Sequence, residues 1–277
     1  MPFAPNLALH DVTRRVCEAY IRNHDHGLLL SGEVGCGLKT IANALAKGLN
    51  RESDGVLCIE PEEDKDISID QIRQLYHETR AVRSTQLTVI IDDAEHMSLP
   101  AQNAFLKLLE EPPERLVFVL TSHYPHLLLE TIRSRVASIE VRRISEDDSR
   151  QLITNTGIND ATTISQLMFL SEGRPAGLLK LIADASYFEH RATIMRSARE
   201  IIQGSPYQRL TGLKDAMSDR DKAIEIVSTI GDLVAYGAKK GLSQQAVRQL
   251  NAISNTIDKL HANANVRLQL LALALSL

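Results

Sequence analysis

The chain has 277 residues, of which 44% are hydrophobic and 24% charged, and its formal net charge at pH 7 is -4. This length allows about two domains with a substantial buried core. The negative charge argues against a protein that binds nucleic acid alone through a strongly basic face.

The cysteines and the chain ends give no sign of a metal site, a disulfide or a membrane segment. Cys17, Cys36 and Cys58 are odd in number, far apart and without C-x-x-C spacing, so we expect reduced thiols and no structural zinc. The first residues do not resemble a signal peptide. The C-terminal stretch LQLLALALSL is about half as long as a membrane span requires. We therefore expect a cytoplasmic protein.

From about residue 9 to residue 142, short apolar runs alternate with helical patterns. This alternation predicts an α/β fold with a parallel sheet and helices on its faces. The expected strands are Gly27–Leu30, Val56–Ile59, Leu87–Ile91, Leu116–Thr121 and Ser138–Val141. The expected helices between them are Thr40–Leu49, Ser68–Val82 and Leu99–Glu110. Sheets of this kind bind ligands at the carboxyl ends of their strands.

Beyond Val141 the strand patterns end and helical patterns continue to the C-terminus. Ser145, followed by three acidic residues, is typical of a helix N-terminus. The stretch 173–177 breaks the helical pattern, and Pro175 suits the first turn of a new helix. These signals predict three domains: an α/β domain over 1–142, a small helical domain over 143–185 and an all-α domain over 186–277.

The stretch SGEVGCGLKT, residues 31–40, resembles a phosphate-binding loop with one altered position. In the pattern G-x-x-x-x-G-K-[ST], glycine amides surround phosphates, the lysine contacts the terminal phosphates and the hydroxyl holds magnesium. Gly32 and Gly37 have the required spacing, but Leu38 stands in the place of the lysine, and Lys39 and Thr40 follow one position late. The loop lies between an expected strand and an expected helix, as a phosphate loop must.

Three interpretations of this loop remain open. In the first, an extra residue in the loop returns Lys39 to the usual place of the lysine, and the site can hydrolyse a nucleotide. In the second, the loop has the ordinary register and cannot support hydrolysis, because Lys39 is rotated by about 100° about the helix axis and Leu38 offers no charge to a phosphate. In the third, the glycines, including Gly35, serve only a tight turn between strand and helix.

A second candidate motif is the apolar strand Leu87–Ile91 with the acids that follow it. Asp92 stands where nucleotide hydrolases hold magnesium. Asp93 stands where ATPases of this type usually carry a glutamate, and its side chain is one methylene shorter. The simpler interpretation is that two acids end a strand and cap the next element.

A third candidate is Thr131–Arg135, a turn that carries Arg133 and Arg135. A guanidinium supplied by a neighbouring molecule can stabilise the charge that develops on a transferred phosphate. The simpler interpretation is a solvated basic face.

Together these segments resemble the clamp-loader branch of the AAA+ proteins, most closely its delta-prime members. The segments that carry the resemblance are IDQIR at 69–73, VIIDDA at 89–94, AQNAFLKLLEEP at 101–112 and TIRSR at 131–135. Weaker support comes from 172–178 and 265–271. The resemblance implies an AAA+ α/β domain, a helical lid and a C-terminal helical collar that joins subunits into an open ring.

The family implies a subunit of the DNA polymerase III holoenzyme, a DNA-directed DNA polymerase. Its expected partners are ATP-hydrolysing gamma or tau subunits, the delta subunit, the sliding clamp and, through the assembled ring, primer–template DNA. Gly32, Gly35, Gly37, Lys39 and Thr40, with Asp92 and Asp93, would form a degenerate, non-hydrolytic nucleotide site. ATP and magnesium would bind to neighbouring subunits. The alternatives are an active gamma-type ATPase that uses these same residues and an AAA+ protein outside replication.

The resemblance assigns an arginine finger to this chain. Ser134, Arg135 and Val136 match the family's Ser-Arg-Cys motif except at the cysteine. Arg135 would enter the ATP site of the adjacent subunit.

Other family positions are matched less completely. Thr121 falls near the sensor-1 position, and Ala176 stands where active members carry a sensor-2 arginine, although Arg174 is close. The four-cysteine zinc module of many members is lacking, so zinc is not expected.

Overall fold

The computed structural model describes residues 3–50, 55–62, 66–79, 86–238, 241 and 243–277. The chain divides into two compact units, Met1–Ala183 and Asp184–Leu277. The division falls close to the expected boundary between residues 185 and 186. The expected separation of 143–185 from the sheet domain stays a prediction.

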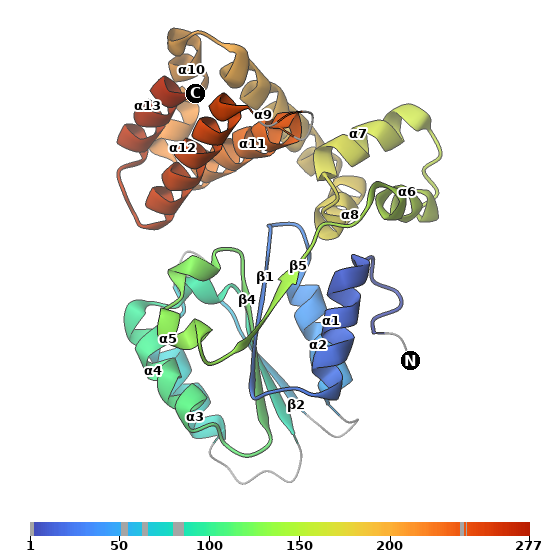
Figure 1. The fold of residues 1–277 in the computed structure, drawn as a ribbon, viewed down its shortest axis with the longest axis vertical. Helices are drawn as coiled ribbons and strands as arrows, with labels where there is room; N and C mark the ends of the chain where they lie inside the picture. The colour runs from blue at the N-terminus through green and yellow to red at the C-terminus, as the bar shows by residue number, and fades with distance from the viewer. Residues whose placement is uncertain (1–2, 51–54, 63–65, 80–85, 239–240, 242) are drawn as a thin grey trace. The chain divides into compact units, whose positions relative to one another are not determined.

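The first unit is built on a five-stranded sheet in the order β2-β3-β4-β1-β5, with every neighbouring pair parallel (Figure 1). The strands are β1 Gly27–Gly32, β2 Gly55–Ile59, β3 Leu87–Ile91, β4 Leu116–Ser122 and β5 Ala137–Val141. The predicted α/β class and all five predicted strands are confirmed.

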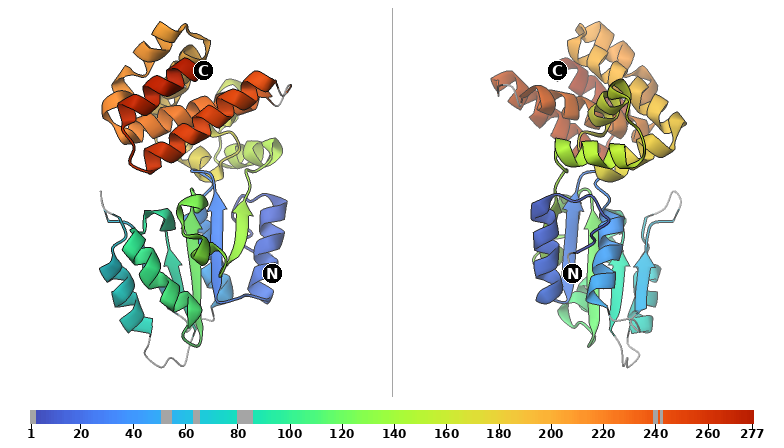
Figure 2. Two further views of the ribbon diagram at one scale, coloured as in Figure 1. Left: turned by 60° about the vertical axis from the view of Figure 1, so that its left-hand side comes forward. Right: turned by 90° about the vertical axis from the view of Figure 1, so that its right-hand side faces the viewer.

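Helices cover both faces of this sheet (Figure 2). On one face, α1 Asp11–Arg22 and α2 Leu38–Leu49 pack on a core that includes Leu28 and Leu30 of β1. Leu29, between them, points to the other face and joins a second core. The second core is covered by α3 Ile69–Thr79, α4 Leu99–Glu110 and α5 Glu130–Arg133. Apolar residues on both faces explain why the strands are continuous apolar runs rather than alternating ones.

Capping residues and prolines set the ends of the helices, as the sequence predicted. The Ser98 hydroxyl accepts a hydrogen bond from the Ala101 N–H and caps α4, which ends before Pro112. Helix α3 was expected to reach Val82, and its last expected residues lie outside the described ones. Short 3-10 turns, η1 Ala94–His96 and η2 Pro125–Leu127, follow β3 and β4.

After Val141 every described regular element is helical, as predicted. The first unit ends with α6 Glu146–Asn155, α7 Ala161–Ser171 and α8 Pro175–Ala183. The second unit contains α9 Ala185–Gln203, α10 Pro206–Gly212, η3 Lys214–Ser218, α11 Arg220–Ala238, α12 Gln244–His261 and α13 Val266–Ser276, around an apolar core of its own. None of the described helices combines the length and apolar character that a membrane span requires.

Candidate functional site

The loop between β1 and α2 has the tight backbone that its glycines predict. Gly35 and Gly37 have φ values of +91° and +83°, in the left-handed region, where residues with a Cβ are strained. A Cβ on Gly32 would lie 2.9 Å from the carbonyl oxygen of Val141. All three glycines are therefore required by the path of the chain, whether or not a phosphate binds.

Leu38 is the first residue of α2 and follows the helix cap, Gly37, directly. Its side chain is 3% exposed and belongs to the apolar core beneath the loop. A loop lengthened by one residue requires the helix to begin at Lys39, which the structure does not show. The position that a phosphate loop gives to its lysine is thus filled by a buried leucine.

Lys39, the second residue of α2, lies among carboxylates. Its ammonium group makes an ion pair with Glu60 and another with Asp92, at 3.2 Å from Oδ2. The hydrogen bond to Glu60 and the proximity of Asp92 raise the pKa of Lys39 above its ordinary value. The lysine is therefore firmly protonated and still contacts the acid at the end of β3. Thr40, one residue further along α2, is exposed.

The ends of β3 and β4 are joined by hydrogen bonds. The hydroxyl of Thr121 donates to Asp92 Oδ1 at 2.7 Å, and the backbone N–H of Asp93 donates to the Thr121 hydroxyl at 2.9 Å. Asp92 is 7% exposed. The predicted acid and the residue at the expected sensor-1 position therefore lie in direct contact.

The carboxylate of Asp93 lies beside His123. Its backbone is left-handed, with φ of +48°, and its Oδ1 lies 3.7 Å from His123 Nε2. Burial, followed by the negative charges of Asp92 and Glu95, raises the pKa of the Asp93 carboxyl. This carboxyl is a weaker acid than an ordinary aspartate.

His123 was not expected to take part in the site. Its Nδ1 lies 2.7 Å from the carbonyl oxygen of Gly32, to which it donates a hydrogen bond, and its backbone N–H donates to Glu95 Oε1 at 2.8 Å. It therefore fixes the end of β1 to the loop after β4. Its position directly after β4 was the only signal in the sequence.

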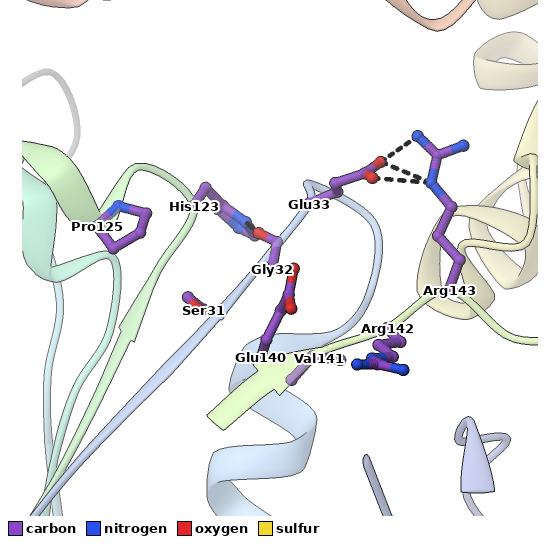
Figure 3. A pocket seen from close by; sticks show the side chains of 9 residues that line it. All are labelled: Ser31, Gly32, Glu33, His123, Pro125, Glu140, Val141, Arg142 and Arg143. Atoms are coloured by element: carbon purple, nitrogen blue, oxygen red, sulfur yellow. Dashed lines mark hydrogen bonds and ion pairs between the residues drawn. The ribbon is translucent and has the colours of Figure 1, made fainter. Parts of the chain in front are cut away.

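A cavity of about 410 Å³ opens beside His123 at the carboxyl ends of β1, β4 and β5. Its lining residues are Ser31, Gly32, Glu33, His123, Pro125, Glu140, Val141, Arg142 and Arg143. Figure 3 shows Glu33 and Arg143 facing each other across its rim. Sequence reasoning missed Glu33 and Arg143, because residues 110 positions apart give no pairing signal.

Ser134 and Arg135 lie at the other end of the sheet. The Ser134 hydroxyl donates to the carbonyl oxygen of Thr131 at 3.2 Å. The Arg135 guanidinium donates to that same oxygen and to Glu110 Oε1, both at 3.0 Å. The Arg135 side chain is 38% exposed.

Strand register shows how far Arg135 lies from the phosphate-like loop. Ala137, two residues after Arg135, pairs with Leu28, whereas Gly32 pairs with Val141. The four residue steps from Leu28 to Gly32 span about 13 Å, since each strand residue rises about 3.3 Å. The structure therefore brings Lys39, Asp92 and Thr121 together at the carboxyl ends of the strands and places Arg135 at their amino ends.

A protein family described as "DNA polymerase III, delta subunit" matches residues 50–145. The match begins after the phosphate-like loop and includes Asp92, Ser134 and Arg135.

Two curated proteins show the extent of the sequence similarity. The chain is 27% identical over 248 residues to DNA polymerase III subunit tau of Bacillus subtilis, covering 78% of this chain and 43% of that protein. It is 29% identical over 207 residues to DNA polymerase III subunit delta' of Pseudomonas aeruginosa, covering 65% of this chain and 62% of that protein. The matched regions thus span less than two thirds of either relative.

A solved structure shares the fold. The crystal structure of a DNA polymerase III gamma subunit-related protein from Thermotoga maritima matches with a TM-score of 0.52 and 22% identity. The match covers 96% of this chain and 98% of that one.

Proposed function

We propose that the chain is a clamp-loader subunit of the DNA polymerase III type, to whose tau and delta' subunits it is similar, and that it acts as a delta-prime-like subunit. It does not hydrolyse ATP, and it supplies Arg135 to the ATP site of a neighbouring subunit while the sliding clamp is loaded onto primer–template DNA. Its partners are gamma or tau subunits and the delta subunit. The neighbours bind ATP and magnesium, and this chain needs neither these nor zinc for its role.

The observation that carries this proposal is the burial of Leu38. A phosphate loop needs a positive charge at the start of its helix to offset the charge that develops during transfer. Leu38 has no charge and contributes to the core instead. Lys39 is held by two carboxylates, so moving it to a phosphate would break both ion pairs.

The position of Arg135 supports its role toward a neighbour. It lies beside β5, an edge strand of the sheet, and away from the loop of its own chain. Its partners, Glu110 and the Thr131 carbonyl, are surface groups that release a guanidinium at little cost. An exposed arginine at an edge can enter another subunit, as an arginine finger must.

One observation favours the alternative, an active gamma- or tau-like ATPase. Lys39 still contacts Asp92, the residue expected to hold magnesium. In this alternative, ATP with magnesium displaces Glu60 and uses Lys39 in place of the missing lysine.

Measuring ATP binding and steady-state turnover by the isolated chain separates these two functions. We expect turnover no higher than that of a Lys39→Ala, Asp92→Asn double variant, which serves as the matched control. Steady turnover that is lost in the double variant would reject the proposal in favour of the ATPase.

A further inference from the structure

Four charged side chains connect the phosphate-like loop to the helical part of the first unit. Arg143 Nε donates to both carboxylate oxygens of Glu33, at 2.9 and 2.8 Å, and its Nη1 donates to Glu172 Oε2 at 3.0 Å. Arg174 Nη2 donates to the same Glu172 oxygen at 2.7 Å, and its Nε lies 3.6 Å from Glu33. Two carboxylates and two guanidinium groups thus form one cluster with zero net charge.

The backbone around the cluster fixes its geometry. Glu172 ends α7 with φ of +51°, and Gly173 follows with φ of +79°. The Ile144 N–H donates to the carbonyl oxygen of Gly173 at 2.9 Å, and a Cβ on Gly173 would lie 2.7 Å from the Ile144 carbonyl oxygen. This turn brings Glu172 and Arg174 beside Arg143.

The same region is bonded to the loop through main-chain groups. The N–H groups of Ala176 and Gly177, in the first turn of α8, both donate to the carbonyl oxygen of Gly35, at 2.9 and 3.0 Å. A Cβ on Gly35 would come within 3.3 Å of Arg174 Cβ. The loop is therefore in direct contact with α8.

The carboxylate of Glu33 determines whether the loop can bind an anionic ligand. A working phosphate loop offers amide groups and cations to an anionic ligand. Here Glu33 places a carboxylate on the loop itself, and it already binds Arg143 and approaches Arg174. An incoming polyphosphate would be repelled by Glu33 and would have to displace it from both arginines.

We propose that Glu33 is a built-in anion that takes the place of a nucleotide phosphate: without any ligand it holds Arg143 and Arg174 beside the loop, next to the start of α8, and it keeps polyphosphates out. The inference extends the proposed absence of hydrolysis to an absence of phosphate binding, and it rests on that proposed function. The Glu33 side chain is 50% exposed, so its charge can be removed without unfolding the unit.

The first test is the binding of sodium tripolyphosphate by the full chain, measured by titration calorimetry. Glu33→Gln keeps the size of the side chain and leaves the cluster with a charge of +1. We expect it to bind tripolyphosphate about tenfold more tightly than the unaltered chain, the scale of one charge–charge interaction near a protein surface. The control is Glu114→Gln, which removes the same charge at an exposed position outside the cluster. Equal affinities for all three proteins would overturn the proposal.

The second test follows hydrogen exchange at the amides of Ala176 and Gly177. In Glu33→Gln we expect faster exchange at both, and added tripolyphosphate should slow it again because it replaces the lost carboxylate. If exchange stays fast with tripolyphosphate present, then the idea that the Glu33 carboxylate takes the place of a phosphate is wrong. Neither result depends on ATP turnover. Turnover of ATP by the unaltered chain would reject the proposed function. If the unaltered chain shows no turnover and Glu33→Gln fails to bind tripolyphosphate more tightly, only this inference is rejected.

Discussion

Charged side chains at the two ends of the parallel strands of the first unit differ in how they are paired. At the carboxyl end of the strands, Lys39 is paired with Glu60 and Asp92, and Glu33 holds Arg143. At the amino end of the strands, Arg135 is exposed, and the groups that it contacts in the described part of the chain, Glu110 and the Thr131 carbonyl, lie at the surface. Lys39 and Arg143 are thus paired with carboxylates of the same chain, whereas Arg135 is exposed enough to serve a partner, as we propose. Under the proposed function, the phosphate-like loop and Arg135 are separate parts of the sheet domain, so one can lose its phosphate site while the other keeps its role.

The largest expected effect tests the amino end of the strands. Replacing Arg135 with alanine in the assembled complex should lower ATP hydrolysis by about 10³-fold or more at the one site that Arg135 enters, because a finger of this kind offsets charge in the transition state. Steady-state hydrolysis by a complex in which the other ATP sites are inactivated measures this. The matched control is Arg133→Ala, an exposed arginine two residues away. Equal losses in the two variants, or an intact rate in both, would contradict the assignment to Arg135.

The next effect tests the carboxyl end of the strands. Leu38→Ala should lower the free energy of unfolding by about 2–4 kcal/mol, because it removes a buried side chain from the core beneath the loop. Denaturant unfolding measures the change. Val34→Ala in the same loop, where the valine is 59% exposed, should cost less than about 0.5 kcal/mol. A cost for Leu38→Ala as small as that of the control would show that position 38 is not part of the core.

A smaller effect depends on pH. Because the pKa of Asp93 is raised in the folded chain, folding favours its protonated form, and this contribution is lost as pH rises through the folded-state pKa. Asp93→Asn should therefore be more stable than the unaltered chain at pH 7, with no difference below the ordinary aspartate pKa of 3.8. The carboxyl is 41% exposed, so solvent screening limits the gain to under about 1 kcal/mol. Unfolding curves at the two pH values check this, and a variant that is less stable at pH 7 would reverse the sign.

The smallest effect concerns the partner of the finger. Glu110→Gln removes the ion pair with Arg135 and should change the free energy of unfolding by less than about 0.5 kcal/mol, as is usual for exposed pairs. In the complex, ATP hydrolysis should be retained. A large loss of hydrolysis would mean that Glu110 positions Arg135 for its task rather than merely holding it in the free chain.

The sequence predicted those parts of the fold that have local causes. Strand β3 and helix α4 have the predicted bounds, because β3 is a continuous apolar run and α4 has a serine cap and a proline stop. Asp92 and Thr121 were each named from the sequence; their contact was not predicted, and it arises because both follow or end strands at the same end of a parallel sheet.

Other parts of the site could not be predicted from the sequence. The pairing of Lys39 with Glu60 depends on the approach of β2 to α2, which no periodicity encodes. Glu33, Arg143 and Arg174 meet only because the turn at Gly173 brings distant segments together. Such pairs arise from tertiary packing, so a single sequence gives no signal for them.

The burial of Leu38 limits how the loop could be redesigned. Changing that position to lysine would remove apolar packing from beneath the loop and place a new charge beside Lys39, while Glu33 would still repel a phosphate. A change of Leu38 to lysine alone would therefore cost core packing without giving a loop that is free of the Glu33 carboxylate. Rebuilding a cationic phosphate loop here requires changes at both positions, and a compensating change in the core beneath them.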